Sequence, residues 1–499
     1  MRSTDHYRPR FHFTPARNWM NDPNGLVYFD GTYHLFFQYN PDGEDWGNMS
    51  WGHATSDDFV TWTEHPVAIP CTLDEQVYSG SVVVDHENTS GFGGGVTPPL
   101  VAVYTSVFAD GRQAQSLAVS LDGGYAWDRY PGNPVLDRGS TAFRDPKVFR
   151  AADREGHERW IMVAVEAERR QVLVYSSTNL REWTFESTIG PFGPDGVVWE
   201  CPDLFPLDVD GDPLRQRWVL ILSTNHADLS DASATAYVVG DFDGHTFTPE
   251  PPETWRLLDQ GSDFYAAVSF DNVPDRRRIV IGWGSNWQYA AHIPTRPWRG
   301  LMSLPRELGL TTRDGVATLT QSTPVETTAL GASDGAVEAS WRYGPTPLDE
   351  TFSFRAGRHY RLDIEWEIND ATSVGIDLLS GPDGRTRLRY DTVSSELTLD
   401  RSQSGQVDFH PDFATVSSAS APLVDGSLAL QVFVDGSIIE LLADDGAVTI
   451  TDQVFPGHDA DEAVFFAEGG RPSVTFEYFP ARINENEPTL PAAVLRHAG

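Results

Sequence analysis

Residues 56–62 read Ser-Asp-Asp-Phe-Val-Thr-Trp, and this pattern of a polar turn followed by an aromatic residue returns three times along the chain. The other copies are SLDGGYAW from Ser120, STNLREW from Ser177 and the more divergent DFDGHTF from Asp241. The four starts are 64, 57 and 64 residues apart, which is a spacing that repeat architectures show. In each copy Asp, Asn or Gly can close a tight turn, and the aromatic ring can pack back on a neighbouring sheet.

The residues between these turns favour strands over helices. Short runs of β-branched and aromatic residues alternate with Asp, Gly, Asn and Pro turns, as in Tyr33–Tyr39, Leu100–Tyr104, Trp160–Val165 and Trp218–Leu222. Polar residues at expected strand starts recur about every 60 residues, at Asp22, Ser81, Asp145, Glu200 and Asp263. Five such units predict a five-bladed β-propeller, in which the innermost strands begin near one end of a common axis. Side chains at these starts are therefore expected to meet.

The repeat fades after Glu307. Residues 311–349 are rich in Thr, Ala, Ser and Gly and are interpreted as a connector. Alternating strands return without the 60-residue period, at Tyr360–Glu367, Ser373–Leu379, Leu428–Val434, Ile438–Leu442 and Val474–Tyr478. This pattern predicts a β-sandwich. The expected organisation is all-β, with a propeller over 1–310, the connector, and a sandwich with a C-terminal tail over 350–499.

Composition limits the possible partners. The formal net charge is −36, and Lys147 is the single lysine. A surface this acidic repels nucleic acid and anionic lipid, so a small neutral substrate is expected and neither nucleic acid nor membrane is. The two cysteines, Cys71 and Cys201, form neither a disulfide scaffold nor a metal-ligand cluster. The oligomeric state is not predicted.

The N-terminal residues also bear on location. Residues 1–15 are polar and lack the apolar core of a signal peptide. This predicts a cytoplasmic enzyme or a chain whose secretion signal has been removed.

Three acidic residues stand beside prolines at expected strand starts: Asp22-Pro23, Asp145-Pro146 and Glu200-Cys201-Pro202. Any one of them alone is read as a surface turn, but three in phase with the repeat indicate a site. Retaining glycoside hydrolysis needs one carboxylate that attacks the anomeric carbon and another that protonates the leaving oxygen. A third can stabilise the positive charge of the transition state. Asp203 ranks lower as an acid, because its spacing from Glu200 places it on the opposite face of a strand.

At this level of detail the chain resembles glycoside hydrolase family 32, which holds invertases, exo-inulinases, levanases and fructosyltransferases. The resemblance rests first on Trp19–Gly25, Arg144-Asp145-Pro146 and Glu200-Cys201-Pro202. Further matching runs are Tyr78–Ser81, Asn88–Phe92, Asp263–Ala266, Gly282–Gln288, Arg296–Gly300, Leu304–Leu308 and Phe433–Glu440. Small departures are Tyr78, where Phe is frequent, Gly284, where Met is frequent, and Leu441-Leu442, where an aromatic residue is common.

The resemblance implies a role for each matching residue. Asp22 would be the nucleophile, Glu200 the acid/base, and Asp145 the stabiliser of the transition state. The fructose subsite would be lined by Asn21, Gln38, Trp46, Ser81, Arg144 and Tyr265 and bordered by Trp287. Neither a metal nor an organic cofactor is required by this chemistry.

The function expected is that of a β-fructofuranosidase or exo-fructanase. Such an enzyme releases terminal non-reducing β-D-fructofuranose from sucrose or from fructans such as inulin and levan, through a covalent fructosyl-enzyme intermediate. Three alternatives remain open: a fructosyltransferase with the same intermediate, an inverting propeller arabinofuranosidase, and a non-catalytic fructan-binding protein. The run Asn21–Gly25 and the Glu200-Cys201 pair argue against the arabinofuranosidase, and the intact acidic trio argues against the binding protein.

Overall fold

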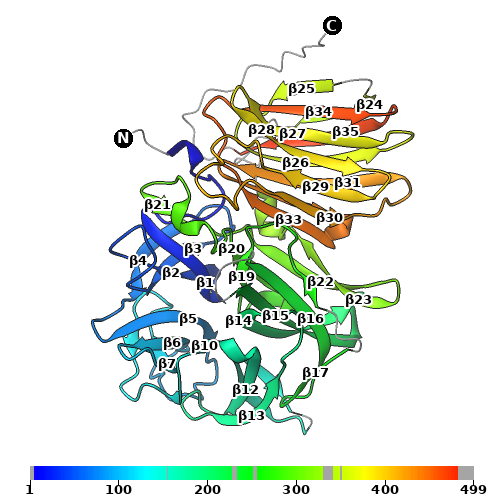
Figure 1. Ribbon diagram of the computed structural model, residues 1–499. Helices are drawn as coiled ribbons and strands as arrows, with labels where there is room; N and C mark the ends of the chain where they lie inside the picture. The colour runs from blue at the N-terminus through cyan, green and yellow to red at the C-terminus, as the bar shows by residue number, and fades with distance from the viewer. Residues whose placement is uncertain are drawn as a thin grey trace.

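The computed structural model of the chain describes residues 5–153, 155–226, 233–250, 255–329, 341–348 and 351–481. Strands dominate both halves, and the helical segments of these residues are short turns such as η1 (Asp5–Tyr7). Figure 1 shows the N-terminal half as blades of sheet around a common centre, with the remaining strands stacked beside them. Over the ranges given above, no helix is both long and apolar enough to cross a membrane. The all-β fold class is confirmed.

Four-stranded groups follow one another through the first half of the described chain. The first comprises β1 (Asn18–Phe29), β2 (Thr32–Tyr39), β3 (Ser50–Ser56) and β4 (Thr63–Ile69). The second comprises β5 (Glu75–Val84), β6 (Leu100–Phe108), β7 (Gln113–Ser120) and β8 (Asp128–Arg129), with β9 (Leu136–Ser140) beside β7. The third comprises β10 (Phe143–Ala152), β11 (Glu158–Glu166), β12 (Gln171–Ser177) and β13 (Thr184–Ile189).

The last two groups share one sheet. The fourth comprises β14 (Val197–Val209), β15 (Asp212–His226), β16 (Ala234–Phe242) and β17 (Phe247–Pro249), with β18 (Arg256–Leu257) beside β16. The fifth comprises β19 (Tyr265–Ser269), β20 (Ile279–Trp283), β22 (Arg306–Arg313) and β23 (Val316–Ser322). A single parallel pair, Val209 with Leu310, joins them. The arrangement is consistent with the five blades expected from the repeat.

A hydrophobic core lies between each pair of neighbouring blades. Adjacent residues on an inner strand point to opposite faces, so Leu204 and Phe205 of β14 belong to the cores on either side of that blade. Each of the five cores contains residues from both of the blades that it joins. In order around the ring, the cores include Val27, Phe36, Val82 and Leu100; Val101, Leu117, Val148 and Met162; Val163, Val174, Leu204 and Leu220; Phe205, Val219, Phe264 and Val280; and Phe270, Ile279, Leu26 and Leu35. The last core joins the fifth blade to the first and closes the ring.

A short backbone contact also closes the ring. β21 (Trp298–Arg299) pairs in parallel with the start of β1, so that Asn18 lies opposite Trp298. The residues that follow β20 therefore extend the first blade, and the beginning of β1 is held from both sides.

The repeated turn motif occupies the same place in four blades, between the third and fourth strands. Asp58 Oδ1 accepts hydrogen bonds from the backbone N–H groups of Val60 and Thr61, at 2.8 and 2.7 Å, and Asn179 Oδ1 does the same for the residues that follow it. The indole N–H groups of Trp62, Trp127 and Trp183 each donate to the carbonyl three residues earlier, at 3.2, 2.9 and 3.0 Å. The pattern therefore encodes one turn with its own hydrogen bonds.

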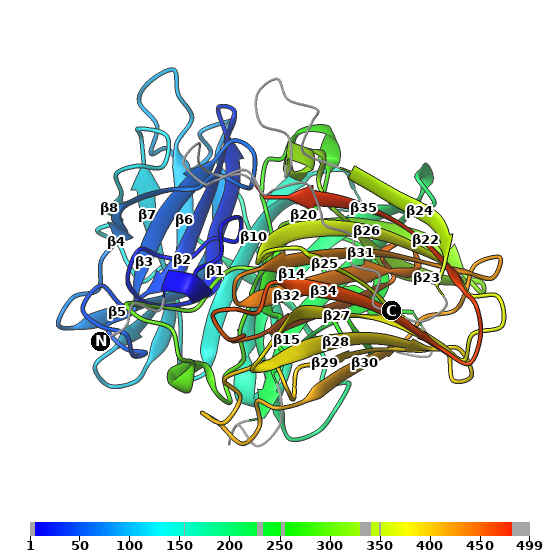
Figure 2. The same cartoon turned by 90° about the horizontal axis from the view of Figure 1, so that it is seen from above.

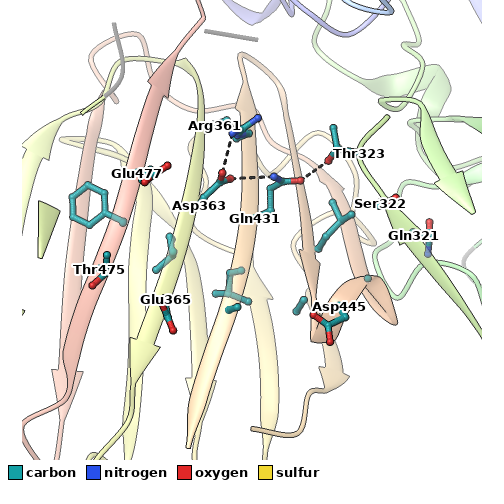
Figure 3. Close-up of a pocket in the computed structure, with 17 residues that line it drawn as sticks. Gln321, Ser322, Thr323, Arg361, Asp363, Glu365, Gln431, Asp445, Thr475 and Glu477 are labelled. Carbon is teal, nitrogen blue, oxygen red and sulfur yellow. Dashed lines mark hydrogen bonds and ion pairs between the residues drawn. The ribbon is translucent and has the colours of Figure 1, made fainter. Parts of the chain in front are cut away.

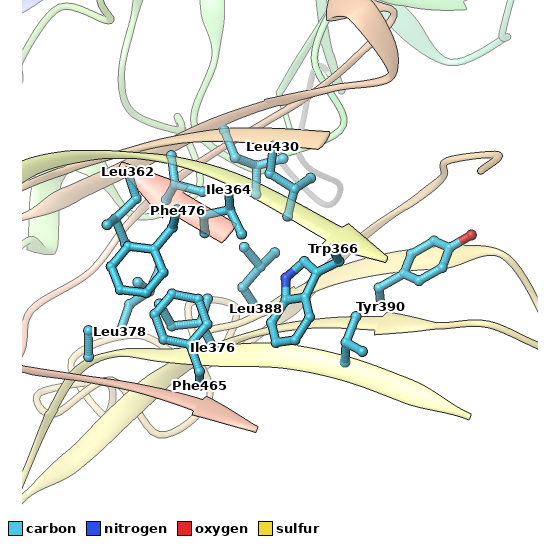
Figure 4. Packing of buried hydrophobic residues seen from close by; sticks show 14 of the residues in the cluster. Leu362, Ile364, Trp366, Ile376, Leu378, Leu388, Tyr390, Leu430, Phe465 and Phe476 are labelled. Carbon is cyan, nitrogen blue, oxygen red and sulfur yellow. The ribbon is translucent and has the colours of Figure 1, made fainter. Parts of the chain in front are cut away.

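The C-terminal half is a sandwich of two six-stranded sheets (Figure 2). One sheet holds β24 (Trp341–Pro347), β35 (Ser473–Pro480), β26 (His359–Glu367), β31 (Ser427–Asp435), β32 (Ile438–Ala443) and β33 (Val448–Gln453). The other holds β25 (Thr351–Arg355), β34 (Glu462–Glu468), β27 (Ser373–Gly381), β28 (Gly384–Asp391), β29 (Glu396–Asp400) and β30 (Val416–Ser420). Figure 4 shows Ile364, Trp366 and Phe476 of the first sheet packed against Ile376 and Phe465 of the second.

The boundaries between the expected domains stay predictions. β23 ends at Ser322 within the sheet of the last two blades, and β24 begins at Trp341 within the sandwich. The expected connector 311–349 therefore contains β23 and β24. The expected tail, residues 484–499, lies outside the described residues.

Three histidines lie side by side across the first blade, and two of them, His34 and His53, are buried. His34, His53 and His65 come from β2, β3 and β4, and their ring centroids are 5.2 and 4.7 Å apart in that order. Burial lowers the pKa of His34 to about 4 and that of His53 to about 2, and the neighbouring rings add to both effects. An unfolded histidine has a pKa near 6.5. The unfolded chain therefore binds protons first as the pH falls below about 6.5, and the folded state loses stability until the pH reaches the folded pKa values.

Replacing both buried rings should weaken this acid sensitivity. In the variant His34→Phe/His53→Phe, the free energy of unfolding should fall less between pH 6.5 and pH 5 than in the parent, by roughly 1 to 2 kcal/mol per ring. Urea denaturation at the two pH values measures this, with His458→Phe, an exposed histidine, as the control. Parallel pH dependences for parent and double variant would contradict the prediction.

Candidate active site

The innermost strand of every blade is interrupted by a β-bulge, close to the residues expected in the site. The pairing register shifts between Met20 and Pro23, Tyr78 and Gly80, Arg144 and Lys147, Glu200 and Asp203, and Tyr265 and Val268. A bulge leaves residues out of the ladder and redirects their side chains. Pro146 and Pro202 lie inside two of these bulges, where no ladder N–H is needed. The acid-Pro pairs of the sequence are therefore the local signature of a bulge.

Asp22 from the first blade is almost fully buried. Ser79 Oγ donates to its Oδ2 at 2.7 Å, and Asn21 Nδ2 donates to its Oδ1 at 3.0 Å. The thiol of Cys201 lies 3.5 Å from Oδ2. Burial raises the pKa of Asp22 and the charge of Glu200 raises it further, while these three donors act in the opposite direction. The site thus sets desolvation against directed hydrogen bonds at one carboxylate.

Asp145 from the third blade is also buried and has a different set of partners. The backbone N–H of Cys201 donates to Oδ2 at 3.0 Å, and Arg144 Nε lies 3.9 Å from the same oxygen. The residue has a positive φ of 59°, and its own N–H donates to Thr105 Oγ1 at 3.0 Å. Burial raises the pKa of Asp145 to about 7; Glu200 and Asp22 contribute to the rise, and Arg144 opposes it.

Glu200 from the fourth blade is the most accessible of the three carboxylates, with 20% of its side chain exposed. Arg144 Nη2 and Nε donate to Oε1 at 2.8 and 3.1 Å. Asn225 Nδ2 donates to Oε2 at 2.9 Å, and the hydroxyl of Tyr265 donates to the same oxygen. Both oxygens are therefore held by side chains from three blades.

Cys201 joins the two aspartates. Its thiol lies 3.5 Å from Asp22 Oδ2 and 3.8 Å from Asp145 Oδ2. Burial raises the pKa of the Cys201 thiol well above its usual value, and the surrounding carboxylates raise it further. The thiol therefore stays protonated and acts as a weak donor between two negative groups.

Of the remaining residues expected in the site, Asn21, Arg144 and Tyr265 contact the carboxylates directly, as described above. Trp46 is 47% exposed, and its ring meets Tyr78 edge-on at 6.0 Å. Trp287 stacks on Trp19 at 6.0 Å and belongs to the same apolar cluster as Tyr265 and Cys201. Gln38 is buried and donates to the carbonyl of Val77 at 3.1 Å.

Ser81 is held by the neighbouring blade. Its hydroxyl donates to the carbonyl of Pro146 and accepts from the N–H of Val148, both at 2.9 Å. Ser79, two residues earlier, contacts Asp22 instead. The sequence analysis named Ser81 alone. The register shift between Tyr78 and Gly80 separates the two serines, which simple alternation would have placed on one face of β5. A role for Ser81 in the sugar subsite stays a prediction.

Two further residues were missed by sequence reasoning, Asn225 and Thr105. Asn225 lies near the end of β15, and its Nδ2 also reaches Tyr265 Oη at 2.9 Å. Thr105 lies in β6 and orients the backbone of Asp145. Neither residue lies in an innermost strand or in a recognisable motif, so no local signal could have identified it.

Asp203 lies away from the acidic trio, as expected from its spacing. Its Oδ2 is 3.2 Å from Nζ of Lys147 and accepts from the N–H of Ser269 at 2.6 Å. The single lysine of the chain is thus buried between the third, fourth and fifth blades, where it neutralises an acid of the neighbouring strand.

Asp263, in contrast, was placed wrongly among the residues that meet at the axis. Its side chain is fully buried and pairs with Arg401 of the sandwich, with Nη1 2.5 Å from Oδ2. Tyr265, two residues later, is the fifth-blade residue that reaches the carboxylates. β19 begins at Tyr265, so Asp263 precedes the strand.

Two other features of the described residues lie apart from the acids. Asp153, Glu155 and His157, in the turn between β10 and β11, have potential cation ligands within 4.8 Å of one another, and Glu155 and His157 are exposed. A pocket over the outer face of the first sandwich sheet is lined by Arg361, Asp363 and Gln431, which form hydrogen bonds with one another and with Thr323 (Figure 3). Neither feature contains an acid of the trio.

Comparisons with known protein families match almost the whole described chain. The family model described as "Glycosyl hydrolases family 32 N-terminal domain" matches residues 12–322, and the family's C-terminal model matches residues 325–481. A levanase of Bacillus subtilis is 43% identical over 475 residues, which cover 93% of this chain and 68% of the levanase. The extracellular exo-inulinase inuE of Aspergillus ficuum is 39% identical over 503 residues, with 93% and 92% of the two chains covered.

The fold is also similar to that of a solved structure. The crystal structure of an exo-inulinase from Aspergillus awamori superposes with a TM-score of 0.88 at 37% identity, covering 95% of this chain and 98% of that one. The expectation of a cytoplasmic location is wrong in the light of these relatives, because the Aspergillus ficuum relative is named an extracellular protein.

Removing the Ser81 hydroxyl tests its contact with the third blade. Ser81→Ala should lower the free energy of unfolding by about 1 to 3 kcal/mol, because it leaves the Pro146 carbonyl and the Val148 N–H without their buried partner. Urea denaturation measures the loss. Ser437→Ala, which removes a buried hydroxyl without a hydrogen-bond partner among the described residues, serves as the control. An unfolding midpoint equal to that of the parent would contradict this assignment.

Proposed function

The chain belongs to glycoside hydrolase family 32, and from this premise we propose that Asp22, Asp145 and Glu200 hydrolyse terminal β-fructofuranosyl bonds with retention of configuration. The enzyme is a β-fructofuranosidase whose relatives include a levanase and exo-inulinases. Its substrates are sucrose or fructans, from which it releases terminal fructose. The proposal assigns Asp22 as the nucleophile, Glu200 as the acid/base and Asp145 as the stabiliser of the transition state.

The observation that carries this assignment is that the three neighbouring carboxylates differ in burial and in hydrogen-bond donors. Asp22 is buried and receives three side-chain donors, which orient its oxygens and favour the charged form. Glu200 is partly exposed and is held by Arg144, Asn225 and Tyr265 near the solvent side, where a leaving group departs. Different environments for two carboxylates are what separate a nucleophile from a general acid.

In the first step, Asp22 attacks C2 of the terminal fructose and the bond from C2 to the leaving oxygen breaks. Glu200 gives its proton to that oxygen, so the departing sugar leaves as a neutral alcohol. The product of this step is an ester between Asp22 and C2. The donors on both oxygens of Asp22 hold the carboxylate in one orientation.

In the second step, the ionised Glu200 removes a proton from a water molecule, and the resulting hydroxide attacks C2. The ester bond to Asp22 breaks, fructose leaves with its original configuration, and Glu200 is protonated again. Two inversions at C2 give net retention.

Asp145 acts on the positive charge that develops in the transition state of each step. The transition state carries positive charge on the fructosyl ring, which a nearby carboxylate stabilises. Asp145 is buried, close to both Asp22 and Cys201, and held by a backbone N–H. We place the fructose hydroxyls against Asp145, with Asn21, Gln38, Ser81 and Arg144 around the ring and with Trp46, Tyr265 and Trp287 supplying aromatic surface.

A sugar-transferring enzyme would use the same intermediate and differ only in the acceptor. The relatives named above are hydrolases, so water is the favoured acceptor. The inverting arabinofuranosidase alternative is not supported by the family membership.

Substituting the two principal acids should have different consequences. Asp22→Asn should lower kcat/KM on the order of 10³-fold or more on every fructoside, because no ester can form. Glu200→Ala should lower kcat/KM for sucrose by about 10² to 10⁴-fold. It should lower kcat/KM for β-D-fructofuranosyl fluoride much less, since fluoride leaves without a full proton transfer. Steady-state kinetics on both substrates measures this, with circular dichroism as the control for folding. Equal losses on the two substrates for Glu200→Ala would contradict its role as the acid.

Products released over time test the mode of attack. Purified enzyme given sucrose, inulin and levan in parallel should release free fructose from the first time point, because only a chain end can reach a site that holds one terminal sugar. Chromatography of the products measures this. Early accumulation of long oligosaccharides, or of a difructose product, would contradict exo hydrolysis.

A further inference from the structure

The sandwich contacts the propeller through the backbone of the segment that leads into Tyr265. β33 is the edge strand of its sheet, and residues 259–263 run beside that edge. Gln260 N–H donates to the carbonyl of Thr449 at 2.9 Å, and Asp263 N–H donates to the carbonyl of Thr451 at 3.0 Å. Gly261 lies so close that a Cβ there would be 2.2 Å from the Thr451 carbonyl oxygen. The backbone of this segment therefore packs directly against β33, at the interface between the propeller and the sandwich.

Asp263 is the strongest anchor in this segment. Arg401 Nη1 lies 2.5 Å from Asp263 Oδ2, which also accepts from the backbone N–H of Gln453 at 2.8 Å. Tyr289 Oη donates to Asp263 Oδ1 at 2.7 Å and accepts from Arg401 Nη2 at 2.9 Å. Asp263, Tyr289 and Arg401 are all buried. Two sandwich groups and one propeller ring thus fix a single carboxylate.

The anchor is two residues from the site. Phe264 lies beneath the guanidinium of Arg306, 4.3 Å from the ring centroid, and its carbonyl accepts from Thr235 Oγ1 at 3.1 Å. Tyr265 follows and donates its hydroxyl to Glu200 Oε2. A displacement of Asp263 would therefore be passed to Tyr265 along only two peptide units.

Tyr265 depends on the Asp263 anchor for its position, because the innermost strand of the fifth blade is shorter than those of the other blades. β19 has 5 residues, whereas β1, β5, β10 and β14 have 12, 10, 10 and 13. Like the innermost strands of the other blades, β19 has a break in register, here between Tyr265 and Val268. Its ladder thus has few hydrogen bonds with which to fix Tyr265.

A second loop of the same blade is held by the same strand of the sandwich. Ser285 Oγ lies 3.2 Å from Gln453 Oε1. Asn286 Nδ2 donates to the carbonyl of Ser262 at 2.7 Å, which ties this loop to the anchored segment. The next residue is Trp287, which borders the site.

We propose that the sandwich positions the acid/base of the propeller, with Arg401 and Asp263 as positioning residues that act through Tyr265 on Glu200. The inference rests on the proposed role of Glu200. Its consequence is that the sandwich contributes to protonation of the leaving group as well as to stability.

The variants Asp263→Asn and Tyr289→Phe test the proposal. Asp263→Asn removes the charge that binds Arg401, and Tyr289→Phe removes one hydroxyl of the network while it keeps the buried ring. Asp435→Asn is the matched control, because Asp435 is an equally buried carboxylate of the sandwich that holds the N-terminal segment through the N–H groups of residues 10–12. The readout is the ratio of kcat/KM for sucrose to kcat/KM for β-D-fructofuranosyl fluoride, measured below the unfolding temperature of each variant.

Asp263→Asn and Tyr289→Phe should each lower this ratio by roughly 5- to 50-fold. A misplaced acid slows cleavage of sucrose, which needs protonation of its leaving group, more than cleavage of the activated fluoride. Asp435→Asn should lose stability with an unchanged ratio. An unchanged ratio in folded Tyr289→Phe, together with a reduced ratio in Glu200→Ala, would overturn the positioning role alone. An unchanged ratio in Glu200→Ala as well would instead refute the proposed role of Glu200.

Discussion

Two carboxylates are buried next to a third in this protein, and much of the molecule serves to make that arrangement tolerable. Moving an acid out of water favours its neutral form, and neighbouring negative charge has the same effect. Both causes raise the pKa of Asp22 and of Asp145. The surrounding structure answers with directed donors: Ser79 and Asn21 for Asp22, and the Cys201 N–H for Asp145. Catalysis requires this balance, because one acid must attack while another holds a proton.

The groups that donate hydrogen bonds to the three carboxylates come from different blades, so the site exists only when the ring is closed. Ser79 lies in the second blade, Arg144 in the third, Cys201 and Asn225 in the fourth, and Tyr265 in the fifth. Each neighbouring pair of blades shares a packed core, and the last core joins the fifth blade to the first. Close packing makes these interfaces resist small displacements. The geometry of the carboxylates is therefore a property of five interfaces together.

Contacts between the propeller and the sandwich also help to fix the geometry of the site. Buried ion pairs such as Arg306 with Glu440 and Arg401 with Asp263 join the two halves. The net stabilisation from a buried pair is small, whereas loss of one partner is costly, so such pairs fix an arrangement more than they strengthen it. Here they fix the fifth blade, whose short innermost strand begins at Tyr265, the residue that donates its hydroxyl to Glu200.

The sequence by itself determined the repeat, the strands and the three acids. The period of about 60 residues follows from a turn that forms its own hydrogen bonds, as at Asp58 and Asn179, and local bonding of this kind is readable from a few adjacent residues. The acid-Pro pairs likewise mark bulges within single strands. Tertiary structure alone decided the rest. Ser79, Thr105 and Asn225 reach the site because strands distant in sequence converge there, and Asp263 turns away because Arg401, 138 residues later, binds it. Such choices depend on which partner lies nearest in space, and a local pattern carries no information about that distance.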